Sequence, residues 1–276
     1  MTLSERNICF KAGIVLAALS IAAVVAASVT IIPARLILEE TAIRSAGIFQ
    51  ALISRFLKPA PYSVYASIAG AVLYALITAT LIYYFFEKTQ SPEILFVFFF
   101  VLSFAVETTR FMLPLRRVYE IPSLYQLMAA RTLLFGRYFG IFSLFIASVY
   151  ATGLEVQKQR TITLVIVVAT MIIALGVPVD ILTWDTSFNM VNGYTSLFRL
   201  IEIGTFLITI VSFFIASYIR GSREYIFVGL GAFLVFLGRN ILINGDTWAS
   251  PLPGILFLSL GAWFICTQLH KIYLWL

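Results

Sequence analysis

Eight charged residues stand within long apolar stretches of this chain, and they are the side chains best placed to do chemistry. Five are arginines and three are carboxylates: Arg110, Arg131, Arg137, Arg199, Arg239, Glu107, Asp180 and Glu202. A charge at the centre of a bilayer costs about 2.5–3.5 kcal/mol on insertion scales, so such side chains normally face protein or water. Their positions therefore predict a polar site inside a membrane protein.

Two pairs of opposite charges share one spacing. Glu107 and Arg110 are three residues apart, as are Arg199 and Glu202. This spacing places both members of a pair on one helix face. Their helices are predicted to be antiparallel, and the order of charges is reversed, so both arginines point to the same side. If these helices are neighbours, the four residues form an alternating network, because the arginine fork can bind a carboxylate in two places.

Two interpretations of these charges remain open. In one, they neutralise each other and fix helix packing, with the arginines at helix ends reaching the interface. In the other, they line a net-positive pocket in one leaflet that binds an anionic small molecule or a lipid head group. In this hypothesis the residues that contact the anion are Arg110, Arg137, Arg199, Arg239 and Asn240. The carboxylates of Glu107, Asp180 and Glu202 support the site, because they hold the contacting side chains in orientation.

Several chemistries lack the residues they need. Glu39, Glu40 and Arg44 match the EExxxR pattern of the CAAX-protease family, but that resemblance also requires histidines on later helices, and this chain has only His270. Metal hydrolysis and Ser-His catalysis fail for the same reason. No Walker A or Rossmann glycine pattern is present. We therefore expect no metal, no cofactor and a non-enzymatic function.

The elements that hold these residues are predicted to be membrane-spanning helices. Of the 276 residues, 61% are hydrophobic and 12% are charged, whereas a soluble domain carries about 25% charged residues. Apolar stretches of roughly 20 residues can cross a bilayer as helices. The fold class is therefore an all-α integral membrane protein. We predict eight spans, at 9–32, 62–86, 94–115, 129–152, 161–183, 194–219, 224–244 and 252–275.

Residues 1–276 are interpreted as one polytopic membrane domain. An anchor helix (9–32) precedes a connection (33–61) and a seven-helix bundle (62–276). In the connection, apolar residues such as Ile48, Leu52 and Phe56 recur at helical spacing, with basic residues at other positions. This pattern predicts an amphipathic helix on the membrane surface.

The basic residues in the loops predict the orientation of the protein in the membrane. We call the side that holds the N-terminus side A and the opposite side B; eight spans place both termini on side A. The short side-A loops contain basic residues such as Lys88, Lys158 and Arg223, whereas the loops around Asp185 and Asp246 contain none. The positive-inside rule therefore favours a cytoplasmic side A, in the cell (inner) membrane. The eight charges named above all fall in the B-side half, and we expect no intramembrane charge in the A-side half.

Three functions fit these observations. We favour a receptor-like or sensory module, or a non-catalytic complex subunit, whose output is read by a partner protein on side A. The alternatives are a transporter of a small anionic solute and an enzyme that modifies lipid head groups. The one-leaflet charges and the lack of a visible repeat argue against many transporters, and no nucleophile can be assigned. The net charge of +6 comes from scattered residues without a basic run, so we expect no nucleic-acid partner.

Overall fold

The structure is a computed structural model that describes residues 2–31, 60–89 and 91–274. Within these ranges, eight helical segments are long and apolar enough to span a membrane, which confirms the predicted all-α multi-pass membrane protein. Nearly all of the predicted amphipathic helix (33–61) and the whole EExxxR pattern lie outside the described residues. The spans are Leu3–Ile31, Tyr62–Phe86, Pro92–Arg116, Ser123–Ala151, Val156–Gly176, Thr195–Arg220, Glu224–Ile243 and Pro251–Tyr273.

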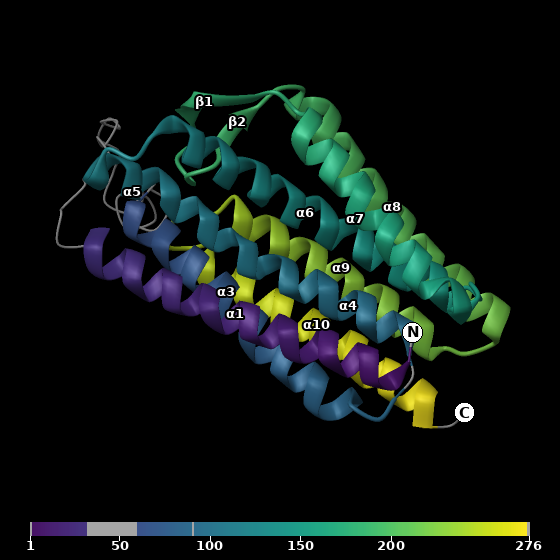
Figure 1. Cartoon of the computed structure of the whole chain (residues 1–276). Helices are drawn as coiled ribbons and strands as arrows, with labels where there is room; N and C mark the ends of the chain where they lie inside the picture. Colours follow the sequence, from purple (N-terminus) through teal and green to yellow (C-terminus); the bar gives the residue numbers. More distant parts are fainter. Residues whose placement is uncertain (1, 32–59, 90, 275–276) are drawn as a thin grey trace, which may run out of the picture.

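The spanning helices run along one common direction and form an elongated bundle, with both ends of the chain at the same end of it (Figure 1). That end is side A. The helices that make up these spans are α1 (Leu3–Ile31), α3 (Pro61–Phe86), α4 (Pro92–Ser103), α6 (Ser123–Ala151), α7 (Gln159–Gly176), α8 (Thr195–Arg220), α9 (Glu224–Ile243) and α10 (Pro251–Leu274). The most extensive packing joins α9 to α10, α4 to α6, α6 to α8, and α8 to α9.

The third span is the most buried and the least regular. In its most apolar window 72% of the residues are buried, against 22% in α8. Its first helix, α4, begins at a cap in which the Ser91 hydroxyl accepts a hydrogen bond from the N–H of Ile94. After Ser103 the chain continues as a 3-10 helix, η1 (Phe104–Phe111), and then as α5 (Met112–Tyr119). A 3-10 stretch inside a longer helix often marks a hinge.

The fifth span is shorter than predicted. The helix expected at 161–183 ends at Gly176, because Pro178 restricts the residue before it to extended backbone; Val177 accordingly has φ −70° and ψ 126°. The chain then forms an antiparallel hairpin of β1 (Val179–Trp184) and β2 (Met190–Asn192). This hairpin lies away from the end that holds the termini (Figure 1), so it belongs to side B. A short 3-10 turn, η2 (Val156–Lys158), precedes α7 on side A.

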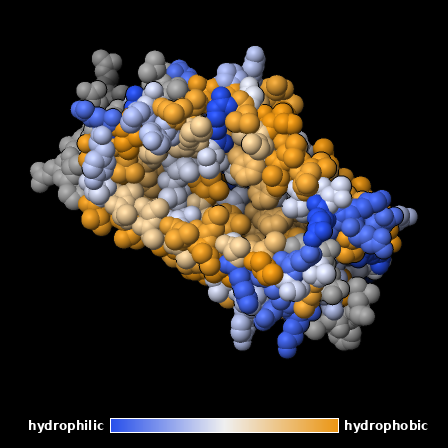
Figure 2. Space-filling model, viewed as in Figure 1, coloured by the Kyte–Doolittle hydropathy of each residue, from blue (hydrophilic) through white to orange (hydrophobic). Residues whose placement is uncertain are grey.

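The surface is consistent with a lipid environment. In Figure 2 apolar residues cover the middle of the visible face, and hydrophilic residues gather toward the two ends of the long axis. Large apolar side chains such as Leu164, Leu200 and Leu252 are 63%, 70% and 72% exposed. A soluble monomer rarely exposes a contiguous apolar surface of this extent, whereas in a bilayer the lipid chains cover it.

Candidate functional site

The centre of the candidate site is a two-point ion pair between the third and fourth spans. Glu107 of η1 is 1% exposed. Its Oε1 accepts a hydrogen bond from Nε of Arg137 at 2.8 Å, and its Oε2 accepts one from Nη2 at 2.8 Å. Arg137 projects from α6, which packs against η1. Fork-to-carboxylate geometry of this kind gives the strongest and most directional of the charged hydrogen bonds.

Arg110 lies on the same face of η1 as Glu107 but is less completely satisfied. Side chains three residues apart are aligned in a 3-10 helix, and Nη1 of Arg110 donates to Oε2 of Glu107 at 3.3 Å. Its Nη2 donates to the backbone carbonyl of Ser187. Arg110 is 3% exposed, and its Nε has no hydrogen-bond partner among the described residues. Two guanidinium groups therefore share one buried carboxylate.

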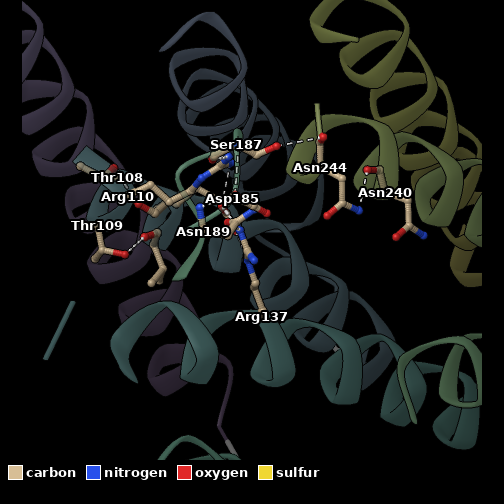
Figure 3. A network of polar contacts seen from close by, with 12 residues as sticks. Thr108, Thr109, Arg110, Arg137, Asp185, Ser187, Asn189, Asn240 and Asn244 are labelled. Atoms are coloured by element: carbon tan, nitrogen blue, oxygen red, sulfur yellow. Dashed lines mark hydrogen bonds and ion pairs between the residues drawn. The ribbon is translucent and has the colours of Figure 1, made fainter. Parts of the chain in front are cut away.

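The tip of the hairpin closes over these arginines (Figure 3). Nη2 of Arg137 donates to Oδ1 of Asn189 at 2.7 Å. The Asp185 carboxylate shapes the tip, because it accepts hydrogen bonds from the N–H of Ser187 at 3.0 Å and the N–H of Asn189 at 2.8 Å. Phe188, between them, has a positive φ of 60° and is 2% exposed. The tip thus ends in buried residues that contact the arginines directly.

The same tip is hydrogen-bonded to the loop between α9 and α10. The Ser187 hydroxyl donates to the carbonyl of Asn244 at 3.0 Å, and the Thr186 hydroxyl donates to Oδ2 of Asp246 at 2.6 Å. Figure 3 shows Asn244 on the far side of the tip from Arg110. The hairpin therefore links the third span to the last two.

A second ion pair lies between α8 and α9. Nη1 of Arg239 donates to Oε1 of Glu202, and the Arg239 guanidinium lies 5.8 Å from the ring centroid of Phe206. Arg239 is 4% exposed. Glu202 is thus paired with Arg239 of the next helix rather than with a residue of the third span. The predicted pair of Arg199 and Glu202 is therefore not formed, although Arg239 lies within electrostatic range of Glu107 and Arg137.

Three predicted site residues lie outside these two clusters. Arg199 is exposed at the start of α8 and has no ion pair within the described part of the chain. Asp180 is exposed on β1, beyond the end of the helix that was expected to hold it. Asn240 donates to the carbonyl of Phe236 at 3.1 Å, one turn earlier on its own helix. Arg131, also within a predicted span, donates to the backbone carbonyls at the end of α7.

The expectation that the A-side half carries no buried charge is wrong. Arg6 is 4% exposed, and its Nη2 donates to the carbonyls of Phe86 and Glu87 at 2.8 Å each. Glu93 is 1% exposed and accepts hydrogen bonds from the hydroxyls of Ser91 and Tyr273. Arg6 stands before the predicted span 9–32 and Glu93 one residue before 94–115, so neither counted among the charges within predicted spans.

Little free space adjoins the arginines. A cavity of about 20 Å³ is lined by Thr109, Arg110, Arg137, Asn189 and other residues of η1, α6 and the hairpin. A buried water needs roughly 10–15 Å³ measured in this way, so the cavity holds about one water molecule. A larger anion would have to displace the hairpin tip.

Known proteins provide no template for this site. No protein family, curated protein or solved structure matches the chain. Within the described ranges, no three histidine, cysteine, aspartate or glutamate side chains gather into a metal site. The site has to be interpreted from its own contacts: the buried Arg110, the largely buried Arg137, one shared glutamate, and a hairpin tip that supplies neutral hydrogen-bond acceptors and, at longer range, the charge of Asp185.

Proposed function

We propose that this chain is a receptor-like membrane protein whose ligand is an anionic group that reaches Arg110 and Arg137 from side B. The observation that carries the proposal is the incomplete pairing of Arg110. Its acceptors are one carboxylate oxygen at 3.3 Å and one neutral carbonyl. Hydrogen bonds between two ionised groups are roughly twice as strong as neutral ones, so an anion that replaces the Ser187 carbonyl gains free energy.

The hairpin tip is the group that such an anion displaces. Ser187 and Asn189 offer the arginines only a carbonyl and an amide oxygen, and the adjoining cavity has room for about one water. A carboxylate or phosphate group fits between the arginines once the tip withdraws. The position of the site toward one leaflet favours a receptor over a transporter, because many transporters bind their substrate near the bilayer midplane.

η1 supplies the moving element in this proposal. It carries Glu107 and Arg110 in the middle of the most buried span and is eight residues long. A 3-10 helix rises about 2.0 Å per residue and an α-helix about 1.5 Å, so conversion of this stretch to α-helix shortens the span by about 4 Å. We propose that α4 carries this displacement to side A, where a partner protein responds to it.

The proposal is tested by thermal unfolding of the purified chain in detergent with a panel of carboxylates and phosphates. The variants are Arg110→Gln and, as a matched control, Arg199→Gln, which removes an exposed arginine that forms no ion pair with the described residues. An anion should raise the Tm of the wild type and of Arg199→Gln but not that of Arg110→Gln. Equal responses from both variants, or no response from the wild type, would contradict the proposal.

A further inference from the structure

A groove between α3 and α10 lies apart from the charge network and has no role in the proposed receptor mechanism. Its volume is about 520 Å³, within the range of roughly 300–1,000 Å³ that is usual for small-molecule pockets. It is formed by residues 77–86 of α3 and 259–271 of α10. Both stretches are the last part of helices that end on side A, so the groove lies in the A-side leaflet.

The groove has the form of a site for a hydrocarbon chain. Its rims are apolar and reach outward, since Leu81, Phe85 and Trp263 are 49%, 58% and 59% exposed. Its floor is buried and also apolar: Ile82 and Ala262 are 2% and 4% exposed. On a membrane-spanning surface, such a channel faces the acyl chains of the bilayer.

The side-A end of the groove carries a positive charge. Lys271 lines it there, with His270 beside it, about one turn from the end of α10. Lys271 has no ion pair within the described residues, although Glu224 lies within electrostatic range of it. A lysine at this depth extends its amine to the head-group level, where the anionic lipids of a cytoplasmic leaflet concentrate.

From these observations we infer that the groove binds one anionic phospholipid of the A-side leaflet. An acyl chain lies along the groove floor, and the head-group phosphate lies beside Lys271 and His270. The acyl chain and the phosphate are both needed for binding: the groove walls supply no lysine or arginine besides Lys271, and a lone lysine does not retain free phosphate.

The test compares lipids with identical acyl chains and different head groups. Native mass spectrometry of the full chain counts the lipids retained after addition of dioleoyl phosphatidylglycerol or dioleoyl phosphatidylcholine, and a third sample receives inorganic phosphate alone. Phosphatidylglycerol should be retained preferentially, and free phosphate should not bind. Lys271→Gln should lower phosphatidylglycerol occupancy about fivefold, the effect of one basic residue near an anionic surface.

Two further variants make the outcome decisive. Lys158→Gln removes an exposed lysine on side A that does not line the groove, and it should leave retention unchanged. Thr267→Trp fills the groove and should reduce retention of both lipids. Equal retention of the two lipids, or equal effects of Lys271→Gln and Lys158→Gln, would overturn the inference. So would a second copy of the chain associating through this face in place of lipid. If Thr267→Trp misfolds, the comparison of Lys271→Gln with Lys158→Gln still tests the inference.

Discussion

Glu107 is the acceptor on which both arginines of the site depend. It receives two hydrogen bonds at 2.8 Å from Arg137 and one at 3.3 Å from Arg110. A buried ion pair gains little over an apolar pair, but removal of one partner is costly because it leaves the other charge buried without compensation. Here the loss of one carboxylate would leave the buried guanidinium of Arg110 and the largely buried one of Arg137 without it.

Replacement of that carboxylate tests its structural role. Glu107→Gln keeps the shape of the side chain but removes its charge, and it should lower the free energy of unfolding by about 3–5 kcal/mol. Chemical denaturation in mixed micelles measures the change. Glu202→Gln is the matched control: it leaves one guanidinium, that of Arg239, without its carboxylate, whereas Glu107→Gln leaves two, so its effect should be smaller. Equal losses would mean that the number of guanidinium groups left without a carboxylate does not govern the cost.

At the scale of elements, α9 and α10 form the closest contact in the bundle. A Cβ added at Gly238 would lie 2.5 Å from the backbone N of Leu258 and 2.7 Å from the carbonyl of Gly254. A Cβ at Gly261 would lie 2.6 Å from the carbonyl of Gly231. Small residues of this kind let two membrane helices bring their backbones together, and this seam holds the α9–α10 loop beneath the hairpin.

The seam predicts a contrast between two helical glycines. Gly238→Ala should destabilise the protein by about 1–3 kcal/mol, because the added methyl group meets backbone that can move only if the helices separate. Gly204→Ala on α8 has nothing within 4 Å of the added Cβ. It should be neutral or stabilise by up to about 1 kcal/mol through helix propensity. Thermal unfolding of both variants provides the comparison, and a Gly238→Ala protein as stable as the wild type would refute the close seam.

The sequence determined some elements more clearly than others. The eight spans followed from apolar length alone, and the i, i+3 spacing placed Glu107 and Arg110 on one face. The fifth span was predicted to end too late, at residue 183. Pro178 indicates an earlier end, but the apolar pattern on which the prediction rested continues beyond the proline. The partner of Glu107 could not be predicted, because the choice between Arg137 and Arg199 depends on which helices are neighbours. The hairpin tip was missed because its role depends on folding back over the bundle.

At the scale of the whole molecule, the two termini and the site occupy opposite ends. Exposed Arg160 pairs with Glu5 at 2.7 Å, and Arg6 binds carbonyls at the end of α3, so the N-terminal turn is held against the start of α7 and the end of α3. The hairpin and the arginines that it covers lie toward side B. A stimulus on one side of the membrane and a response on the other would therefore require transmission along the helices.

Single cysteines test the predicted orientation. In a background of Cys9→Ser and Cys266→Ala, Lys158→Cys places a thiol on side A, and Val191→Cys places one on the exposed hairpin. If side A is cytoplasmic, a membrane-impermeant maleimide added to intact cells should label Val191→Cys but label Lys158→Cys only after lysis. Labelling of Lys158→Cys in intact cells, with Val191→Cys protected, would reverse the orientation.

The central claim is that an anion at the buried arginines releases the hairpin and changes η1. Hydrogen–deuterium exchange tests it most directly, with and without the anion that most stabilises the wild type. The account predicts faster exchange at residues 185–189 and altered exchange at 104–111, with α9 and α10 unchanged and no effect in Arg110→Gln. Unchanged exchange in both segments while the anion is bound would contradict it, and would leave the charges as a fixed packing network.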